Sequence, residues 1–318
     1  MNLVDVLRAS RRIRPFIRRT PLIDSRWLSD ASDGQIWLKL ESLQVSNSFK
    51  SRGAFNAVLR LIEQGASARL VTASAGNHGR ALAIAAERFS LPLIVFTPVD
   101  APRTKLDAIR RHHATLRAEG RDYDDAERMA KSFVEETGAV FVSPYNDVDV
   151  IQGAATIALE MFENRPDLDT IVVPIGGGGL IAGVAAAARA LKPSCRVIGV
   201  EAAASCAFQT SVKAGRLVKI VPGATLADGL AGNPDSETMT FPMIQRFVDE
   251  IVTVNEDEIR SAITGLAASE HLIAEGAGAV AIAAVLSARI AVARRSVGLV
   301  LSGSNIDAAT LQRVLTGL

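Results

Sequence analysis

The sequence is poor in cysteine, histidine, tyrosine and tryptophan: its 318 residues include 2 Cys, 4 His, 2 Tyr and 2 Trp. The cysteines, Cys195 and Cys206, are too few for a disulfide framework and suit a reducing compartment such as the cytoplasm. The adjacent His112 and His113 would point apart on a helix and cannot chelate together. We therefore expect no metal site.

Charge of one sign and long hydrophobic runs are also scarce. The net charge is +1, with both signs spread along the chain, so we expect no nucleic-acid partner. The N-terminus carries Asp5 early and lacks a long apolar run, which argues against a signal peptide. Residues 276–293 are nearly all apolar, but Ala and Gly dominate them and Arg289 interrupts them. A buried helix is favoured over a membrane span, so we expect no membrane partner.

Short β-branched runs alternate with longer Ala-rich helical runs. The short runs are continuously apolar, which is typical of strands covered on both faces in a mostly parallel α/β sheet. The turn-rich segment 143–149 is a plausible crossing between domains. The expected strands are 36–40, 69–73, 93–97, 139–143, 170–175, 196–200, 250–254 and 297–302.

Three glycine-containing turns follow expected strands, where open α/β sheets bind ligands. They read SAGNHG (74–79), GGGG (176–179) and SGSN (302–305). The tetraglycine turn matches neither the Walker pattern nor GxGxxG, yet its position favours binding of a phosphate at a helix N-terminus. A tight structural turn is the alternative there. The SAGNHG turn could equally be a helix cap.

Lys50 stands in the segment SNSFKSRGA (46–54), where a polar turn meets an apolar-periodic stretch. The pattern predicts that a helix begins at Lys50. A cation at a helix N-terminus is mildly unfavourable. Lys50 is therefore either a solvated side chain or an amine whose pKa is lowered for nucleophilic chemistry.

Taken together and in this order, the four motifs resemble the fold-type-II pyridoxal-phosphate (PLP) enzymes, in the branch of threonine/serine dehydratases and serine racemases. The resemblance runs from RRTPL (18–22) to SGSNID (302–307). It implies a two-domain α/β fold like the tryptophan synthase β subunit, each domain a mostly parallel twisted sheet flanked by helices. The large PLP-binding domain would comprise 1–53 and 147–318, and the small domain 54–146. A homodimer or homotetramer is implied.

The resemblance also implies roles for individual residues. Lys50 would bind pyridoxal 5'-phosphate covalently and act as the catalytic base, and Phe49 would pack against the cofactor ring. Asn77 would hydrogen-bond the ring hydroxyl, and Ser302 would face the pyridine nitrogen. The phosphate would be held by Gly176, Gly177, Gly178 and Gly179. The substrate carboxylate would be received by Ser74, also expected to be catalytic, Ala75, Gly76 and Asn77.

The implied reaction is that of an ammonia-lyase, which converts a small β-hydroxy amino acid such as L-threonine or L-serine to a 2-oxo acid. Ser302 would leave the ring essentially neutral, which favours prompt β-elimination. The racemases use a serine at the place of Ala75, so its methyl group argues against racemisation. Three alternatives stay open: a racemase or β-replacement synthase; another substrate, such as 3-hydroxyaspartate, phenylserine or a hydroxyectoine-derived acid; and a phosphate-binding protein without chemistry.

Some positions depart from the pattern of the branch. Its racemases bind a divalent cation through a glutamate and an aspartate, which correspond here to Glu201 and Ala207. A hard cation needs several oxygen ligands, so the loss of one carboxylate argues against this site. Asn47 replaces a usual glycine, and GAAT (153–156) replaces GQGT. Glu275 lies close to where the family has a glutamate near the cofactor.

Overall fold

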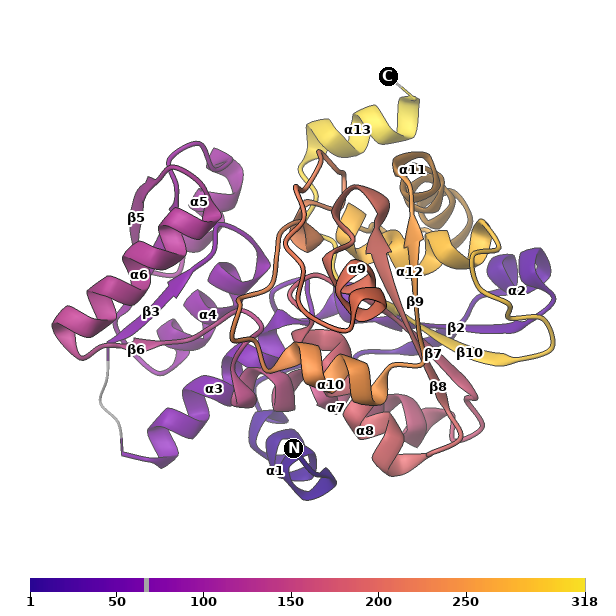
Figure 1. Cartoon of the computed structure of the whole chain (residues 1–318), viewed down its shortest axis with the longest axis horizontal. Coiled ribbons are helices and arrows are strands. Elements are labelled where there is room, and N and C mark those ends of the chain that lie inside the picture. The colour runs from indigo at the N-terminus through magenta and orange to yellow at the C-terminus, as the bar shows by residue number, and fades with distance from the viewer. Residues whose placement is uncertain (66–68, 318) are drawn as a thin grey trace.

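The computed structural model describes residues 1–65 and 69–317. Its strands form two separate sheets with helices packed around each, and Figure 1 shows the two sheets side by side. The predicted α/β class is confirmed.

The larger sheet has six strands in the order β1-β2-β10-β7-β8-β9. Strand β1 runs antiparallel to β2, and the other neighbours are parallel. The strands are β1 (Leu22–Asp24), β2 (Gln35–Leu40), β7 (Thr170–Pro174), β8 (Arg196–Ala202), β9 (Glu250–Val254) and β10 (Ser296–Leu301). The helices that belong with this sheet are α1 (Leu3–Ile13), α2 (Arg26–Ser32), α7 (Val148–Asn164), α8 (Gly179–Leu191), α9 (Ala207–Ala214), α10 (Thr240–Phe247), α11 (Glu256–Gly265), α12 (Gly276–Leu286) and α13 (Ala308–Thr316), with short turns η1 (Glu41–Leu43), η2 (Ala203–Ser205), η3 (Asp228–Leu230) and η4 (Leu266–Glu270).

The smaller sheet has four parallel strands in the order β5-β4-β3-β6. They are β3 (Leu70–Ala73), β4 (Leu93–Pro98), β5 (Thr115–Gly120) and β6 (Val140–Phe141). Around them lie α3 (Lys50–Glu63), α4 (Asn77–Arg88), α5 (Arg103–Arg110) and α6 (Tyr123–Thr137). All four strands fall within the predicted small domain, 54–146, and the division stays a prediction. Helix α3 packs against both α4 and α7, so it joins the two halves.

Each expected strand is present, although β6 is reduced to Val140–Phe141. Strands β1 and β5 were not expected. Strand β1 has three residues, and β5 reads TLRAEG, whose charged side chains interrupt any apolar run. Both lie at a sheet edge. An edge strand pairs with a neighbour on one side only, and its sequence then carries a weaker hydrophobic pattern than that of a central strand.

The apolar segment 276–293 forms α12 only as far as Leu286. Its residues from Gly276 to Val285 are buried, and the helix lies within the core of the larger sheet. In the described ranges 1–65 and 69–317, we find no helix long and apolar enough to cross a membrane. The expectation of a buried helix is confirmed.

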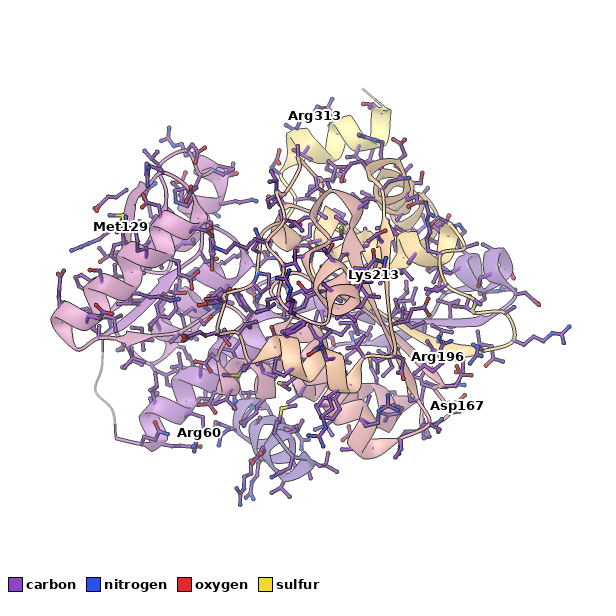
Figure 2. The ribbon with its side chains drawn as sticks, viewed as in Figure 1. Arg60, Met129, Asp167, Arg196, Lys213 and Arg313 are labelled. Atoms are coloured by element: carbon purple, nitrogen blue, oxygen red, sulfur yellow. The ribbon has the colours of Figure 1, made fainter. Side chains whose placement is uncertain are left out.

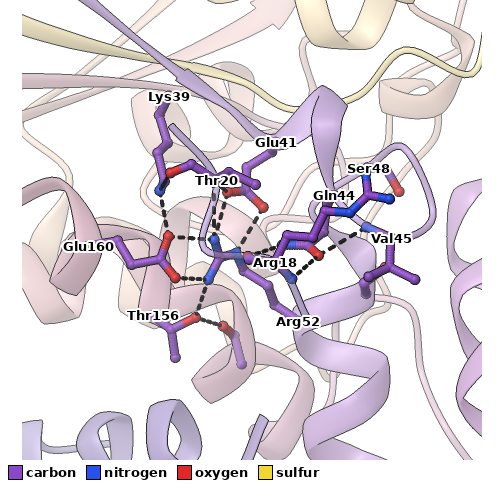
Figure 3. Close-up of polar contacts among 12 residues, drawn as sticks. Arg18, Thr20, Lys39, Glu41, Gln44, Val45, Ser48, Arg52, Thr156 and Glu160 are labelled. Atoms are coloured by element: carbon purple, nitrogen blue, oxygen red, sulfur yellow. Dashed lines mark hydrogen bonds and ion pairs between the residues drawn. The ribbon is translucent and has the colours of Figure 1, made fainter. Parts of the chain in front are cut away.

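The start of α3 is held by a buried ionic cluster around Arg52 (Figure 3). The Arg52 guanidinium donates from Nε and Nη2 to both oxygens of Glu41, each at 2.8 Å. It also donates from Nη1 and Nη2 to both oxygens of Glu160 at 2.8 Å. Lys39, itself buried, donates to Glu160 and to the carbonyl oxygen of Thr20. The four charged side chains of this Arg52 cluster balance one another.

The pKa values in the Arg52 cluster follow from this pairing. Burial by itself would lower the pKa of Arg52, but the carboxylates of Glu41 and Glu160 hold it above its ordinary value. For Lys39, desolvation outweighs the attraction of the same carboxylates, so its pKa is lowered. The cluster connects β2, η1, α3 and α7, and it fixes the helix turn that begins with Lys50.

We predict that Arg52→Met strongly destabilises the protein. The change leaves Glu41 and Glu160 buried with one remaining cation, and breaking a buried ion pair costs about 3–5 kcal/mol. Urea unfolding followed by circular dichroism measures the loss. The matched control is Arg60→Met further along the same helix (Figure 2), whose ion pairs with Glu63 and Asp149 are partly exposed to solvent. It should cost at most about 1 kcal/mol. Equal losses in the two variants would contradict a structural role for the cluster.

Candidate active site

The loop before Lys50 is tied to the turn that follows β10. Phe49 N donates to the carbonyl oxygen of Ser302 at 3.0 Å, and Ser48 forms a β-bridge with Gly303. Helix α3 begins at Lys50, as predicted, with no side-chain cap at Phe49. Segments 46–54 and 302–305, which are far apart in the sequence, therefore lie side by side.

The Lys50 side chain is half-buried, and its amine reaches the loop that precedes α7. Its Nζ donates to the carbonyl oxygen of Pro144 at 2.6 Å and lies 5.0 Å from the centre of the Phe49 ring. Desolvation lowers the pKa of Lys50 to about 8, although the negative charge of Glu275 opposes this shift. A useful fraction of the amine is thus neutral near physiological pH, which nucleophilic or base chemistry requires.

The tetraglycine turn packs against the segment that receives the Lys50 amine. It follows β7, and α8 begins at Gly179, so the turn forms a helix N-terminus. Gly178 has φ +86°, a left-handed conformation that favours glycine. A Cβ atom on Gly177 would lie 2.3 Å from the Tyr145 ring, and one on Gly179 would lie 2.9 Å from the Tyr145 backbone. Because Tyr145 follows Pro144, consecutive residues contact the tetraglycine turn and the Lys50 amine.

The SAGNHG turn follows β3 and leads into α4, which begins at Asn77. Ser74 Oγ accepts a hydrogen bond from Gly76 N at 3.2 Å, which folds the turn back on itself. A Cβ atom on Gly79 would lie 2.3 Å from the carbonyl oxygen of Ser74, so this close return requires glycine. Ala75 stands in the middle of the turn and offers only a methyl group.

A polar network connects the SAGNHG and SGSN turns. Asn77 Nδ2 donates to Glu275 Oε1 at 2.6 Å, and Asn305 Nδ2 donates to Asn77 Oδ1 at 2.7 Å. Asn305 N donates to the second Glu275 oxygen at 3.1 Å, and Arg80 donates to Asn305 Oδ1 at 2.6 Å. Burial raises the pKa of Glu275 to about 7. Sequence reasoning missed Asn305 and Arg80 because hydrogen bonding between distant turns leaves no local pattern.

Ser302 and His78 are both buried beside these turns. Ser302 Oγ donates to the carbonyl oxygen of Ala277 in α12 at 3.3 Å. The His78 ring shares a hydrogen bond of 3.1 Å with the carbonyl oxygen of Val142. Burial and the charge of Lys50 lower the pKa of His78 to about 3, so the ring is neutral.

Asn47, which departs from the glycine of the sequence pattern, adopts a left-handed φ of +57°. Asparagine tolerates this conformation better than most residues. Its carbonyl oxygen accepts a hydrogen bond from Ser304 N at 3.0 Å. The replacement thus keeps the turn that precedes Lys50 in the conformation that a glycine would give.

This arrangement fits pyridoxal phosphate. A glycine-rich helix N-terminus suits a phosphate group, because no side chains shield its N–H groups and the helix end favours an anion. A lysine of lowered pKa that contacts the neighbouring Pro144–Tyr145 segment suits covalent binding of an aldehyde. The SGSN turn links the segment before Lys50 to the SAGNHG turn, through Phe49 and through Asn305.

Comparison with known proteins agrees with this fit. The family model described as "Pyridoxal-phosphate dependent enzyme" matches residues 13–303. The chain belongs to this family. A relative in the family, the L-threonine ammonia-lyase of Thermotoga maritima, is 41% identical over 99% of this chain and 78% of its own length. The serine racemase of Arabidopsis thaliana is 37% identical over 98% of this chain and 96% of its own length.

A solved structure supports the same family. The structure of maize serine racemase superimposes with a TM-score of 0.93 at 32% identity, covering 99% of this chain and 97% of that one. The cofactor of this chain is therefore pyridoxal 5'-phosphate, as the sequence motifs implied. Because the family consists of enzymes, the chain is an enzyme rather than a phosphate-binding protein without chemistry.

We predict that the apoprotein amine of Lys50 reacts with an acylating reagent with a midpoint near pH 8. Its reactivity should rise with pH, because only the deprotonated amine reacts. Mass spectrometry of the digest measures this rate against surface Lys213 as an internal reference. Glu275→Gln should lower the midpoint, since the Glu275 charge raises the Lys50 pKa. A midpoint above about pH 10, the range of an unperturbed lysine, would contradict the assigned environment.

Proposed function

We propose that this enzyme is an ammonia-lyase that removes water and ammonia from a small β-hydroxy amino acid, such as L-threonine or L-serine, to give a 2-oxo acid. The observation that carries the proposal is the position of Lys50, whose amine contacts Pro144 while the adjacent Tyr145 contacts the tetraglycine turn. The Pro144–Tyr145 segment thus contacts both a base of suitable pKa and the proposed phosphate site.

The proposed roles follow from the contacts around Lys50. When bound, pyridoxal phosphate supplies an electron sink that weakens the Cα–H bond of the substrate. Lys50 would hold the cofactor, and its free amine would take the Cα proton of the substrate. Phe49 packs beside the cofactor, and Gly176–Gly179 hold the phosphate. The substrate carboxylate is received by Ser74, Ala75, Gly76 and Asn77.

Ser302 supports elimination as the main outcome. Its hydroxyl already donates to the Ala277 carbonyl oxygen, and it carries no charge. A serine facing the ring nitrogen does not keep that nitrogen protonated as an aspartate would, so negative charge at Cα is less stabilised. Prompt loss of the β-hydroxyl then outruns slower reactions at Cα.

Serine racemase is the main alternative, because racemases are among the similar proteins. Racemisation needs a second acid on the face of the substrate opposite Lys50. We place Ala75 there, and its methyl group carries no transferable proton. Within the lyases, 3-hydroxyaspartate, phenylserine and hydroxyectoine-derived acids remain alternative substrates, and β-replacement chemistry remains an alternative reaction.

We also propose a cytoplasmic homodimer or homotetramer made of the large domain 1–53 and 147–318 and the small domain 54–146. Cys195 and Cys206 are free thiols, which suits a reducing compartment. Size-exclusion chromatography with light scattering tests the oligomeric state.

We predict that Lys50→Ala lowers 2-oxo acid release from L-threonine by about 10²–10⁴-fold or more, because one residue serves as both anchor and base. Borohydride reduction of the wild type followed by peptide mapping should find the cofactor on Lys50. Lys213→Ala, a surface lysine on α9 (Figure 2), is the control and should keep full activity. Cofactor fixed on another lysine, such as Lys105, would overturn the site assignment.

We predict that L-serine yields pyruvate with negligible D-serine, and that Ala75→Ser raises the racemised fraction. The new hydroxyl would supply an acid on the face opposite Lys50, and such a group typically contributes about 10²-fold or more. Chiral chromatography beside a pyruvate assay measures the ratio of the products. Ala75→Gly, which adds no hydroxyl, is the matched control and should leave the ratio unchanged. Faster formation of D-serine than pyruvate by the wild type would contradict the proposal.

A further inference from the structure

Glu201 is a buried carboxylate that the proposed reaction does not use. It lies near the end of β8, and both of its oxygens accept hydrogen bonds from the backbone. Phe208 N donates to Oε1 at 2.8 Å, and Gln209 N donates to Oε2 at 2.7 Å. These donors belong to the first turn of α9, which has no side-chain cap at its own N-cap residue, Cys206. Glu201 therefore caps α9 from a neighbouring strand.

This contact lies where the sequence resemblance placed the cation site of the racemases. The partner position is Ala207, the first residue of α9, and it has no oxygen in its side chain. Within residues 1–65 and 69–317, no group of three or more His, Cys, Asp or Glu side chains could hold a metal ion. Burial raises the pKa of Glu201 to about 7, and the two N–H donors at the positive end of α9 partly oppose this shift.

Helix α9 in turn reaches the tetraglycine turn through Phe208. The Phe208 side chain is fully buried, and its Cζ lies 2.9 Å from the position that a Cβ atom would take on Gly178. Gly178 is the residue with φ +86° at the start of α8. Thr240 supports the same turn, donating to the carbonyl oxygen of Gly177 at 3.0 Å. Glu201 therefore binds the backbone of Phe208, whose ring packs against the tetraglycine turn.

We infer that Glu201 is a positioning residue for phosphate binding. By fixing the first turn of α9, it holds Phe208 against Gly178 and keeps the tetraglycine turn in the conformation that presents its N–H groups. In this arrangement, the N–H groups at the start of α9 hold the Glu201 carboxylate without a divalent cation. The inference rests on the proposed role of Gly176–Gly179 as the phosphate site.

The test compares two ligands that differ only in the phosphate. Apoenzyme is titrated with pyridoxal phosphate and with pyridoxal, and binding is followed by the absorbance of the lysine-bound form. Glu201→Gln keeps the side-chain shape but turns one acceptor into an NH₂ group that faces a backbone N–H. We expect about tenfold weaker binding of pyridoxal phosphate, the loss of one charged hydrogen bond, with pyridoxal binding changed less than about twofold.

Phe208→Leu is the second variant, which keeps the test decisive if Glu201→Gln does not fold. It removes the ring edge at Gly178 and leaves the Glu201 cap in place, so it should show the same selective loss. The matched control is Asp249→Asn. Asp249 also accepts from the backbone, at Val197 N (2.8 Å), but at the opposite end of β8. The Asp249→Asn variant should have a lower thermal stability, but the ratio of its affinities for pyridoxal phosphate and pyridoxal should be unchanged.

The inference would be overturned if Glu201→Gln and Phe208→Leu both left the ratio of the affinities for pyridoxal phosphate and pyridoxal unchanged. A second contradicting result would be that a chelator weakens the binding of pyridoxal phosphate to the wild type and that Mg²⁺ or Ca²⁺ restores it. A cation, and not the start of α9, would then hold Glu201 in place. Failure of the wild type to bind either ligand through Lys50 would instead contradict the proposed function.

Discussion

The fold depends most on the pairing of Arg52 with Glu41 and Glu160. An unpaired charge buried at this depth would be prohibitively unfavourable, so the guanidinium, both carboxylates and Lys39 must come together when the chain folds. The bidentate geometry fixes the guanidinium plane as well as its position. Because Arg52 is two residues from Lys50 on the same helix turn, this constraint also sets where the reactive amine lies.

Close backbone packing supplies the second constraint. The tetraglycine turn lies against Tyr145, and the segment containing Tyr145 carries the carbonyl group that receives the Lys50 amine. The Tyr145 hydroxyl accepts a hydrogen bond from Asp235 N at 3.0 Å, so the loop after α9 restrains this segment as well. The tetraglycine turn and the Lys50 amine thus contact one piece of chain.

The sequence was informative wherever a short segment determines its own structure. Continuous apolar runs predicted the buried strands, and the change from polar turn to apolar period predicted the helix start at Lys50. The tetraglycine turn was visible because its backbone needs glycine locally. Strands β1 and β5 were missed because edge strands lack the apolar signal.

Contacts between distant segments could not be predicted in the same way. Asn305, Arg80 and the partners of Arg52 are ordinary polar residues, and only the fold brings them together. Glu201 is a further example. The sequence showed that Ala207 lacks a carboxylate that a cation site would need, but not that the start of α9 donates two hydrogen bonds to Glu201. Sequence patterns thus predicted the positions of the reactive groups, and the structure shows how they are supported.

The charges around Lys50 explain why its pKa is lowered only moderately. Desolvation alone would favour the neutral amine, but the Glu275 carboxylate partly restores the cation. Burial raises the pKa of Glu275 to about 7, so its charge is itself incomplete at neutral pH. His78 stays neutral because its pKa is about 3, and it does not compete for the proton. Lys50 can therefore gain and lose a proton near neutral pH without a large change in energy, as the base role proposed for it requires.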